Sequence, residues 1–354
     1  MIIVNILTKG FDSPNGLAFL FPIILFKSEL KYKFKIKIYT TINKQIENCD
    51  FLLIESKYFR SKWQSSQNQI LKQFREWKEK QIKVIFCDTT DSASWLKSDI
   101  IEHVYKYAKG QLLNDKNLYL KPIYANRVYA EYYHNRKKVS DKNIELSTPI
   151  NKGSIKKLCL SWNSGLSNYS VLAPLLYRYI PLNFAKKIFK FSRKFVSPDK
   201  PRDLINCRFG NTYHLESIRY QRNEIRRILS DYTKTDKLNR LTYFKEMQRS
   251  LVSIVPFGYG EITLKDFESF LNGCILMKPK MSHMKTWPNF YIANETFVPF
   301  SWNLNDLRNC IETVKRNYEK FKEISVNGQE LYKKYTVSKE APELFTEHFE
   351  DLVS

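Results

Sequence analysis

The chain has 354 residues, of which 43% are hydrophobic and 15% aromatic. This composition excludes a disordered protein, and the length favours two packed domains, because a single hydrophobic core usually stops growing at about 250–300 residues. The formal net charge of +22 suggests attraction to phosphate in nucleic acid, nucleotides or anionic lipid head groups, or else a surface of solvated lysines without such a partner.

Cysteine and histidine are too scattered for a structural metal site or a disulfide scaffold. The six cysteines and five histidines form no C-x-x-C pair and no other metal-ligand spacing, which indicates buried, reduced thiols. The apolar run at residues 16–26 follows a strand-like segment, lacks a basic leader and is too short to cross a bilayer. We therefore expect a buried helix there and a cytoplasmic protein.

The first part of the chain alternates predicted strands and helices. Residues 31–40 alternate lysines with aromatic or aliphatic side chains, and this period of two predicts a strand near a sheet edge with one face in water. The apolar strands that follow are separated by helices, which predicts parallel βαβ units and a doubly wound α/β sheet. The predicted strands are residues 2–10, 31–40, 49–56 and 82–91, and the predicted helices are residues 16–30 and 66–81.

Ligands of such sheets bind beyond the carboxyl ends of the strands. Gly10 and Asp12 follow the first predicted strand, and Asp88 and Asp91 end the fourth in the segment DTTDS. We expect these residues on the ligand side of the sheet, where each aspartate either takes part in chemistry or only caps a turn.

A basic amphipathic segment lies near the middle of the chain. Residues 183–195 (NFAKKIFKFSRKF) predict a helix on which apolar residues are interleaved with the cations of Lys186–Lys194. Such a helix either touches an anionic membrane or packs on its own domain with its lysines in solvent. Residues 196–203 contain two prolines and are the predicted linker, so we place the domain boundary at residue 198.

A second alternating unit follows the linker and again predicts a sheet flanked by helices. The predicted strands are residues 204–210, 251–261 and 274–279, and the predicted helices are residues 216–232, 264–273, 304–335 with a break at Gly328, and 340–353.

The turn after residue 256 is the densest chemical feature of the chain. Gly258 and Gly260 allow a sharp backbone turn. Thr263, followed three residues later by Asp266, is expected to form a capping box for a helix that begins near Leu264. The amino terminus of this helix favours a phosphate, and Lys265 adds a positive charge at the same place. We therefore predict a phosphate site at the carboxyl end of this strand.

Two carboxylates accompany the turn. Glu261 lies in the turn itself and Glu268 lies further along the helix. Because carboxylates repel phosphate, we assign both to hydroxyl groups of a sugar or a ribose, with the alternative that Glu268 is only a solvated helix residue. The segment GYGEIT lacks the third glycine of the dinucleotide fingerprint and no Walker A loop is present, which argues against hydride transfer and ATP hydrolysis.

Residues 250–291, 295–314 and 327–335 together resemble a known family. They are similar to the carboxyl-terminal half of bacterial GT-B-fold glycosyltransferases that assemble cell-surface polysaccharide or lipopolysaccharide. The resemblance is strongest over residues 203–337, and in the amino half only the order of elements matches. It implies two Rossmann-like domains that face each other across a cleft: an acceptor-binding domain at residues 1–198, a nucleotide-sugar-binding domain at 199–338, and a helix at 339–354 that returns to the first domain.

The resemblance also implies a donor site on the second domain. Glu268 would contact the ribose, and Lys265 would contact phosphate. The remaining implied donor contacts are Gly258, Tyr259, Gly260, Glu261, Thr263, Ser282 and His283.

Two features of the sequence depart from the family. Only six residues separate Glu261 from Glu268, whereas seven are usual in retaining members. The usual Arg and Lys pair has no clear match, so its charge is expected from another cation, namely Arg219, Arg222, Arg226 or Lys245. His283 has an alternative role in packing its loop.

A GT-B enzyme would stabilise its leaving diphosphate with cations and helix termini, and the absence of a D-x-D motif agrees with a reaction without a metal or other cofactor. Inversion would require a base such as Asp12, Asp88 or Asp91, whereas retention would not. The expected partners are a nucleotide-sugar and a glycan or lipid-linked glycan acceptor, at the inner face of the membrane. A basic nucleic-acid-binding protein and a non-catalytic sugar-nucleotide scaffold are the alternatives.

Overall fold

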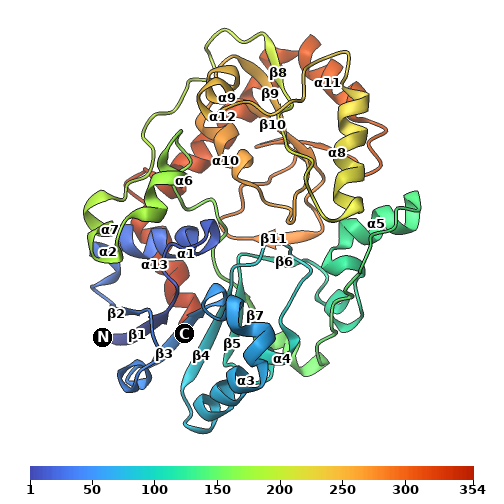
Figure 1. The fold of residues 1–354 in the computed structure, drawn as a ribbon. Helices are drawn as coiled ribbons and strands as arrows, with labels where there is room; N and C mark the ends of the chain where they lie inside the picture. The colour runs from blue at the N-terminus through green and yellow to red at the C-terminus, as the bar shows by residue number, and fades with distance from the viewer.

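A computed structural model describes residues 1–354, and its amino-terminal part is built on a six-stranded parallel sheet (Figure 1). The strands run in the order β2-β1-β3-β4-β5-β7. As predicted, the strand with alternating lysines lies at the edge, where Lys35 and Lys37 are exposed. The strands are β1 (Ile2–Leu7), β2 (Phe34–Tyr39), β3 (Phe51–Glu55), β4 (Lys83–Asp88), β5 (Lys106–Lys109) and β7 (Leu158–Leu160).

Helices cover both faces of this sheet, so the predicted doubly wound architecture is confirmed. On one face, Leu53 packs with residues of α1 (Pro14–Leu25) in a single buried cluster. On the other face, Leu52 packs with Phe74 and Trp77 of α3 (Trp63–Glu79). Shorter helices are α2 (Lys27–Leu30), α4 (Ser98–Ile101), α5 (Val128–Lys137), α6 (Ala173–Leu176) and α7 (Leu182–Ile188).

The second domain has a four-stranded parallel sheet in the order β12-β10-β9-β8. Met277 packs toward α8 and α11, whereas Leu276 packs with the residues of α10 and α12, so helices again cover both faces. The strands are β8 (Leu204–Asn206), β9 (Ser250–Ile254), β10 (Ile275–Pro279) and β12 (Val298–Phe300). The helices are α8 (Glu216–Ile228), α9 (Arg240–Met247), α10 (Leu264–Leu271), α11 (Leu307–Arg316) and α12 (Tyr318–Thr336).

Two helices pack on a different domain from the chain segments next to them in sequence (Figure 1). The last helix, α13 (Ala341–Leu352), packs on the first domain, where Lys106 Nζ donates to the Leu352 carbonyl at 3.1 Å and the Phe34 and Phe349 rings lie 5.2 Å apart. In the other direction, α5 packs beside α8 of the second domain, and Gln221 Nε2 donates to Tyr133 Oη at 2.8 Å. Part of the predicted first domain therefore forms a wall of the second.

A two-stranded sheet joins the domains. Strand β6 (Gln111–Leu113) of the first domain pairs in antiparallel register with β11 (Met284–Thr286) of the second (Figure 1). Asn163 reinforces the ladder, because its Nδ2 donates to Thr286 Oγ1 at 2.9 Å and to the Pro288 carbonyl at 2.7 Å. The largest buried cluster also contains residues of both domains, among them Phe86 and Phe267.

Two local predictions were wrong. The basic segment is helical only to Ile188, because Phe189 and Phe191 turn into the core and pack on Phe21 of α1 at ring distances of 4.9 and 5.1 Å. Gly328 does not break a helix but lies inside α12, where a methyl group would meet the Phe270 ring and the Thr296 carbonyl at 2.8 Å. Gly328 therefore allows close packing of α12 on its neighbours.

None of the helices combines the length and the apolar character that crossing a bilayer requires.

Candidate functional site

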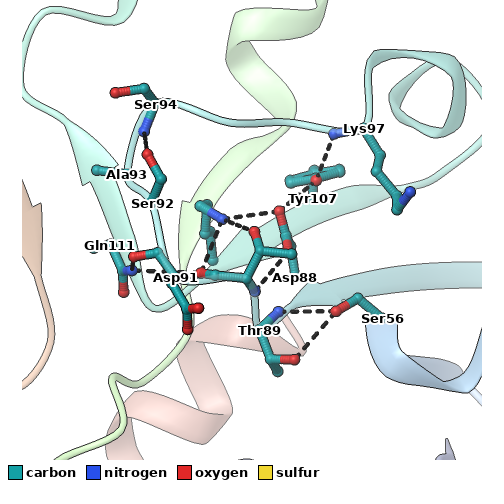
Figure 2. Close-up of polar contacts among 12 residues, drawn as sticks. Ser56, Asp88, Thr89, Asp91, Ser92, Ala93, Ser94, Lys97, Tyr107 and Gln111 are labelled. Atoms are coloured by element: carbon teal, nitrogen blue, oxygen red, sulfur yellow. Dashed lines mark hydrogen bonds and ion pairs between the residues drawn. The ribbon is translucent and has the colours of Figure 1, made fainter. Parts of the chain in front are cut away.

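Asp88 ends β4 inside a saturated polar network (Figure 2). Its Oδ2 accepts from Lys109 Nζ at 2.9 Å and from Tyr107 Oη at 2.7 Å, and Oδ1 accepts from the Thr90 amide at 2.9 Å. Burial acts to raise the pKa of Asp88, but Lys109 and these hydrogen bonds outweigh it and hold the pKa below its ordinary value. Asp88 is therefore committed to holding the loop after β4 and is not free to take a proton from a substrate.

Asp91 lies in the same loop and has a different environment (Figure 2). Its side chain is exposed, and Oδ1 accepts one hydrogen bond, from Asn15 Nδ2 of α1 at 2.8 Å. Asp12 is also exposed, near the amino terminus of α1, and its carbonyl accepts from Arg178 at 2.8 Å. Of the three candidate aspartates, the structure leaves Asp12 and Asp91 chemically available.

A small cavity of about 40 Å³ opens between the domains beside Asp91. It is lined by the carboxyl ends of β4, β5 and β7 in the first domain and by Ile262 of the second. The predicted position of ligands at the carboxyl ends of these strands therefore coincides with the interdomain cleft.

The glycine turn of the second domain packs directly against this loop. A methyl group on Gly260 would overlap the backbone of Asp91, so only glycine allows the two segments to approach this closely. The turn is also held by two residues of the first domain: Tyr129 Oη donates to the Gly258 carbonyl and Arg127 Nε to the Tyr259 carbonyl, both at 2.8 Å.

Glu261 does not face an open sugar site in this structure. It is fully buried, and its Oε2 accepts from the Ala93 amide of the first domain at 3.0 Å. Its Oε1 lies 3.5 Å from His283 Nε2. Burial acts to raise the pKa of Glu261, but His283 and the Ala93 amide lower it below its ordinary value. Glu261 therefore links the two domains.

His283 and the exposed Ser282 line a second cavity, of about 340 Å³, at the carboxyl ends of β10 and β12. The imidazole packs edge-on against Trp302 at 4.9 Å, and its buried Nδ1 has no hydrogen-bond partner. Ser282 is held through its carbonyl, which accepts from Asn114 Nδ2 at 2.5 Å. No group of three or more His, Cys, Asp or Glu side chains in the molecule is arranged to hold a metal ion.

A cluster of cations surrounds the carboxyl end of β8, next to the glycine turn. Burial raises the pKa of the Cys207 thiol to about 12, and the positive charges of four neighbouring side chains oppose this shift. We call these side chains the cation cluster: Lys265, Arg226, Arg208 and Arg222.

Three members of the cation cluster already have protein partners. Arg208 pairs with Glu246 at 2.7 Å, and Arg226 Nη2 donates to the Phe209 carbonyl at 2.7 Å. Arg222 donates from Nε to the Phe257 carbonyl at 2.9 Å, and its Nη2 lies 3.6 Å from where a Cβ on Gly258 would be. The Arg222 guanidinium therefore borders the glycine turn.

Lys265 is the cation without a partner. Its ammonium donates no hydrogen bond and lies 4.7 Å from the centre of the Tyr243 ring, and burial lowers its pKa to about 8. The predicted capping box of Thr263 and Asp266 is present at the start of α10 and places Lys265 in the first helical turn. Glu268 acts to raise the pKa of Lys265, and the ammonium keeps its hydrogen-bond donors for an external anion.

Glu268 is buried and not solvated, with only 3% of its surface exposed. Its Oε1 pairs with Arg240 Nη1 at 2.9 Å. Burial raises the pKa of Glu268, while Arg240 and Lys265 act to lower it. Glu268 and Lys265 therefore belong to one charged group on the same side of α10.

The predicted donor residues thus divide into two groups. Lys265, Glu268 and Arg222 gather with Gly258 around the cation cluster, whereas Glu261, Ser282 and His283 face the first domain. Sequence reasoning missed Arg208 and Arg240. Arg208 lies two residues after the end of β8, so its place at the carboxyl end of a strand could have identified it. The pairing of Arg240 with Glu268 depends on how α9 packs. Of the other proposed cations, Arg219 pairs with Glu216 and Lys245 is exposed.

Comparisons with known proteins bear on the fold only. No protein-family model and no curated protein sequence matches the chain. A glycosyltransferase from Rickettsia africae is similar over 100% of this chain and 99% of that one, with 8% identity and a TM-score of 0.47. An Anabaena protein in complex with UDP-glucose is similar over 99% and 100%, with 8% identity and a TM-score of 0.44. UDP-GlcNAc 2-epimerase from Neisseria meningitidis, bound to UDP-GlcNAc, is similar over 99% and 100%, with 10% identity and a TM-score of 0.41. At these identities and TM-scores, the likenesses assign no activity to the chain.

Replacing Lys109 by methionine would leave the Asp88 carboxylate buried without its cation. We expect Lys109→Met to lower the free energy of unfolding by about 3–5 kcal/mol at neutral pH, measured by chemical denaturation. The pKa of Asp88 is lower in the folded than in the unfolded protein. The ionised Asp88 therefore contributes fully to the free energy of unfolding above the unfolded-state pKa, and this contribution is lost as the pH falls through the folded-state pKa. The difference in free energy of unfolding between Lys109→Met and the wild type should therefore become smaller at acid pH.

The control for this experiment is Asp91→Asn, which removes an exposed carboxylate of the same loop. Its stability should stay within about 0.5 kcal/mol of the wild type. Equal stability of Lys109→Met and Asp91→Asn would contradict the structural role assigned to Asp88.

Proposed function

We propose that the protein is a glycosyltransferase that moves a sugar from a nucleotide-sugar to a glycan or lipid-linked glycan acceptor. One observation carries this proposal: the glycine turn beside Lys265 and Arg222 packs on the backbone of Asp91. A diphosphate held by the cations and an acceptor hydroxyl near the aspartate would meet at this contact. A sugar transferase needs these two groups side by side.

The cation cluster would hold the donor diphosphate. Lys265 and Arg222 would neutralise the charge that develops on the leaving nucleoside diphosphate, in a site where burial strengthens electrostatic interactions. We propose that this set of cations acts without a metal ion or other cofactor. Glu268 would accept hydrogen bonds from the ribose hydroxyls, with Arg240 opposing the rise in its pKa that burial causes.

Asp91 would be the general base of an inverting reaction. Its carboxylate is exposed, borders the interdomain cavity and is oriented by Asn15. It would accept the proton of the acceptor hydroxyl as the oxygen attacks the donor sugar. The other available aspartate, Asp12, does not line this cavity and faces a separate pocket with Lys9 and Ser13.

Donor binding should depend on the charge of Lys265. A thermal-shift screen of nucleotide-sugars identifies the donor, because a ligand stabilises the folded state by mass action. Calorimetry should then show an affinity about 10- to 100-fold lower for Lys265→Gln, as expected for the loss of a hydrogen bond from a charged group. Glu268→Ala should weaken binding as well.

The pH dependence provides a further test of the same site. Lys265 is protonated below its pKa of about 8 and loses its charge above it, so donor affinity should fall as the pH rises through 8. Lys265→Arg should remove this dependence, because arginine stays charged. Lys245→Gln, on the exposed surface of α9, is the control and should bind like the wild type. If Lys265→Gln and Glu268→Ala both bind the donor as tightly as the wild type, these residues do not form the donor site.

The base is tested by Asp91→Asn. With the donor identified and its acceptor supplied, this variant should lose about 10²- to 10⁴-fold in kcat while its donor affinity stays close to that of the wild type. Asp12→Asn should keep its kcat. A wild-type rate in Asp91→Asn would exclude Asp91 as the base and would leave a retaining mechanism.

We further propose that the enzyme works at the cytoplasmic face of an anionic membrane. Large apolar side chains are exposed along α6, α7 and the turn between them, with 55% of Leu175, 57% of Leu176 and 51% of Phe184 accessible. The cations Lys186 and Lys187 are exposed in the same segment. We call this surface the α6–α7 patch. Apolar anchors together with cations match a leaflet that carries negative head groups.

Vesicle co-sedimentation tests the patch. The wild type should bind vesicles that contain phosphatidylglycerol and should not bind pure phosphatidylcholine. A Leu175→Ser, Leu176→Ser double variant should lose about tenfold in partitioning, because apolar contact contributes to interfacial binding along with charge. Leu241→Ser is the control, since this residue of α9 is 62% exposed outside the patch. An equal loss of vesicle binding in the double variant and in Leu241→Ser would contradict a role of the α6–α7 patch.

A further inference from the structure

A polar pocket of about 530 Å³ opens on the first domain, apart from the cation cluster. It lies at the carboxyl ends of the adjacent strands β1 and β3, beside the amino terminus of α1, and no hydrophobic residue lines it. Its wall comes from the turn after β1 and from the helical turn at residues 56–62 that follows β3. This composition suits a charged or hydroxylated ligand.

Three cations in this pocket have no protein partner. Lys9, Lys57 and Arg60 all line it, and none of them donates a side-chain hydrogen bond or forms an ion pair with the protein. Lys57 is half-buried, and Lys9 and Arg60 are exposed at the mouth of the pocket. Asp12 and Glu55 also line the pocket but form an ion pair with none of the three cations, so the ammonium and guanidinium groups remain free to bind an external anion.

Lys57 connects the pocket to the proposed base. It is half-buried, and burial lowers its pKa, while the carboxylates of Asp91 and Asp88 act in the opposite direction. Lys57 is therefore within electrostatic reach of Asp91. An anion on Lys57 would lie next to the place where the acceptor hydroxyl is deprotonated.

Glu55 provides a second, independent sign of a missing ligand. It is fully buried in the pocket wall, and its Oε1 accepts from the Lys57 amide at 2.9 Å and from Thr89 Oγ1 at 2.7 Å. Its Oε2 is buried without any hydrogen-bond partner. Burial raises the pKa of Glu55, which favours the protonated carboxyl group relative to that of an exposed glutamate. Buried polar atoms without partners are rare in folded proteins.

We propose that this pocket binds a phosphate group of the acceptor, held by Lys9, Lys57 and Arg60 with Glu55 as an additional hydrogen-bond partner. This inference rests on the proposed function and specifies its acceptor class as a phosphate-bearing sugar. The phosphate belongs either to a phosphorylated soluble glycan or to a lipid-linked sugar phosphate. In both cases it anchors the acceptor so that a hydroxyl reaches Asp91.

The test measures binding of a hexose phosphate by calorimetry at fixed ionic strength, with the same hexose lacking phosphate for comparison. The wild type should bind only the phosphorylated sugar, and Lys57→Gln and Arg60→Gln should each weaken binding by at least about tenfold, as loss of a charge-assisted hydrogen bond requires. Lys62→Gln is the matched control: it removes the same charge from the same helical turn but outside the pocket. Thermal melting of each variant confirms that it is folded.

A second arm replaces the hexose phosphate by a short-chain prenyl phosphate. Tighter binding of the prenyl compound identifies a lipid-linked acceptor, and tighter binding of the hexose phosphate identifies a soluble one. Absence of binding by both compounds, or equal weakening in Lys57→Gln and Lys62→Gln, overturns the proposal. Nucleotide-sugar affinity is measured in the same variants and should not change, so failure of this pocket is distinguishable from failure of the donor site.

Discussion

The structure depends on the contact that fixes the two domains against each other. Strand β6 pairs with β11, and the largest buried cluster draws its side chains from both domains. Residues of both domains thus form one continuous packed core, and separating them would expose buried apolar surface. The glycine turn reaches Asp91 only because this contact holds the domains at a fixed distance. Gly260 is required there because no side chain fits between the two backbones.

This contact also limits how far the two domains can move apart. Many two-domain enzymes close over their ligand by a hinge motion that excludes water. Here the buried Glu261 binds the Ala93 amide across the interface, and His283 supports it from the second domain. The proposed donor and acceptor sites are therefore already side by side.

Part of the net positive charge of the chain is gathered at three places on the molecule. The proposed donor site gathers the cation cluster at the carboxyl end of β8, and the pocket of the first domain gathers Lys9, Lys57 and Arg60. A third group of cations lies on the α6–α7 patch. We propose that each of the three binds a ligand that carries phosphate. Many other lysines, such as Lys35 and Lys37 on the edge strand, are exposed to solvent. For these residues the alternative stated in the sequence analysis, a surface of solvated lysines without a partner, describes the charge.

The sequence alone predicted the strands and helices before residue 92 and most of those after residue 203, because hydrophobic periodicity and helix capping are local properties. It did not predict β5, β6, β11 or β12. The alternation of lysines in β2 predicted an edge strand, and Thr263 with Asp266 predicted the start of α10. Only the tertiary structure decided which polar groups are free. Asp88 and Asp91 are three residues apart in one segment, yet one is saturated by Lys109 and Tyr107 while the other remains available. Likewise, Lys265 is unpaired and Glu268 is held by Arg240, a residue of a different helix. These differences arise from partners distant in sequence, so no local pattern contains them.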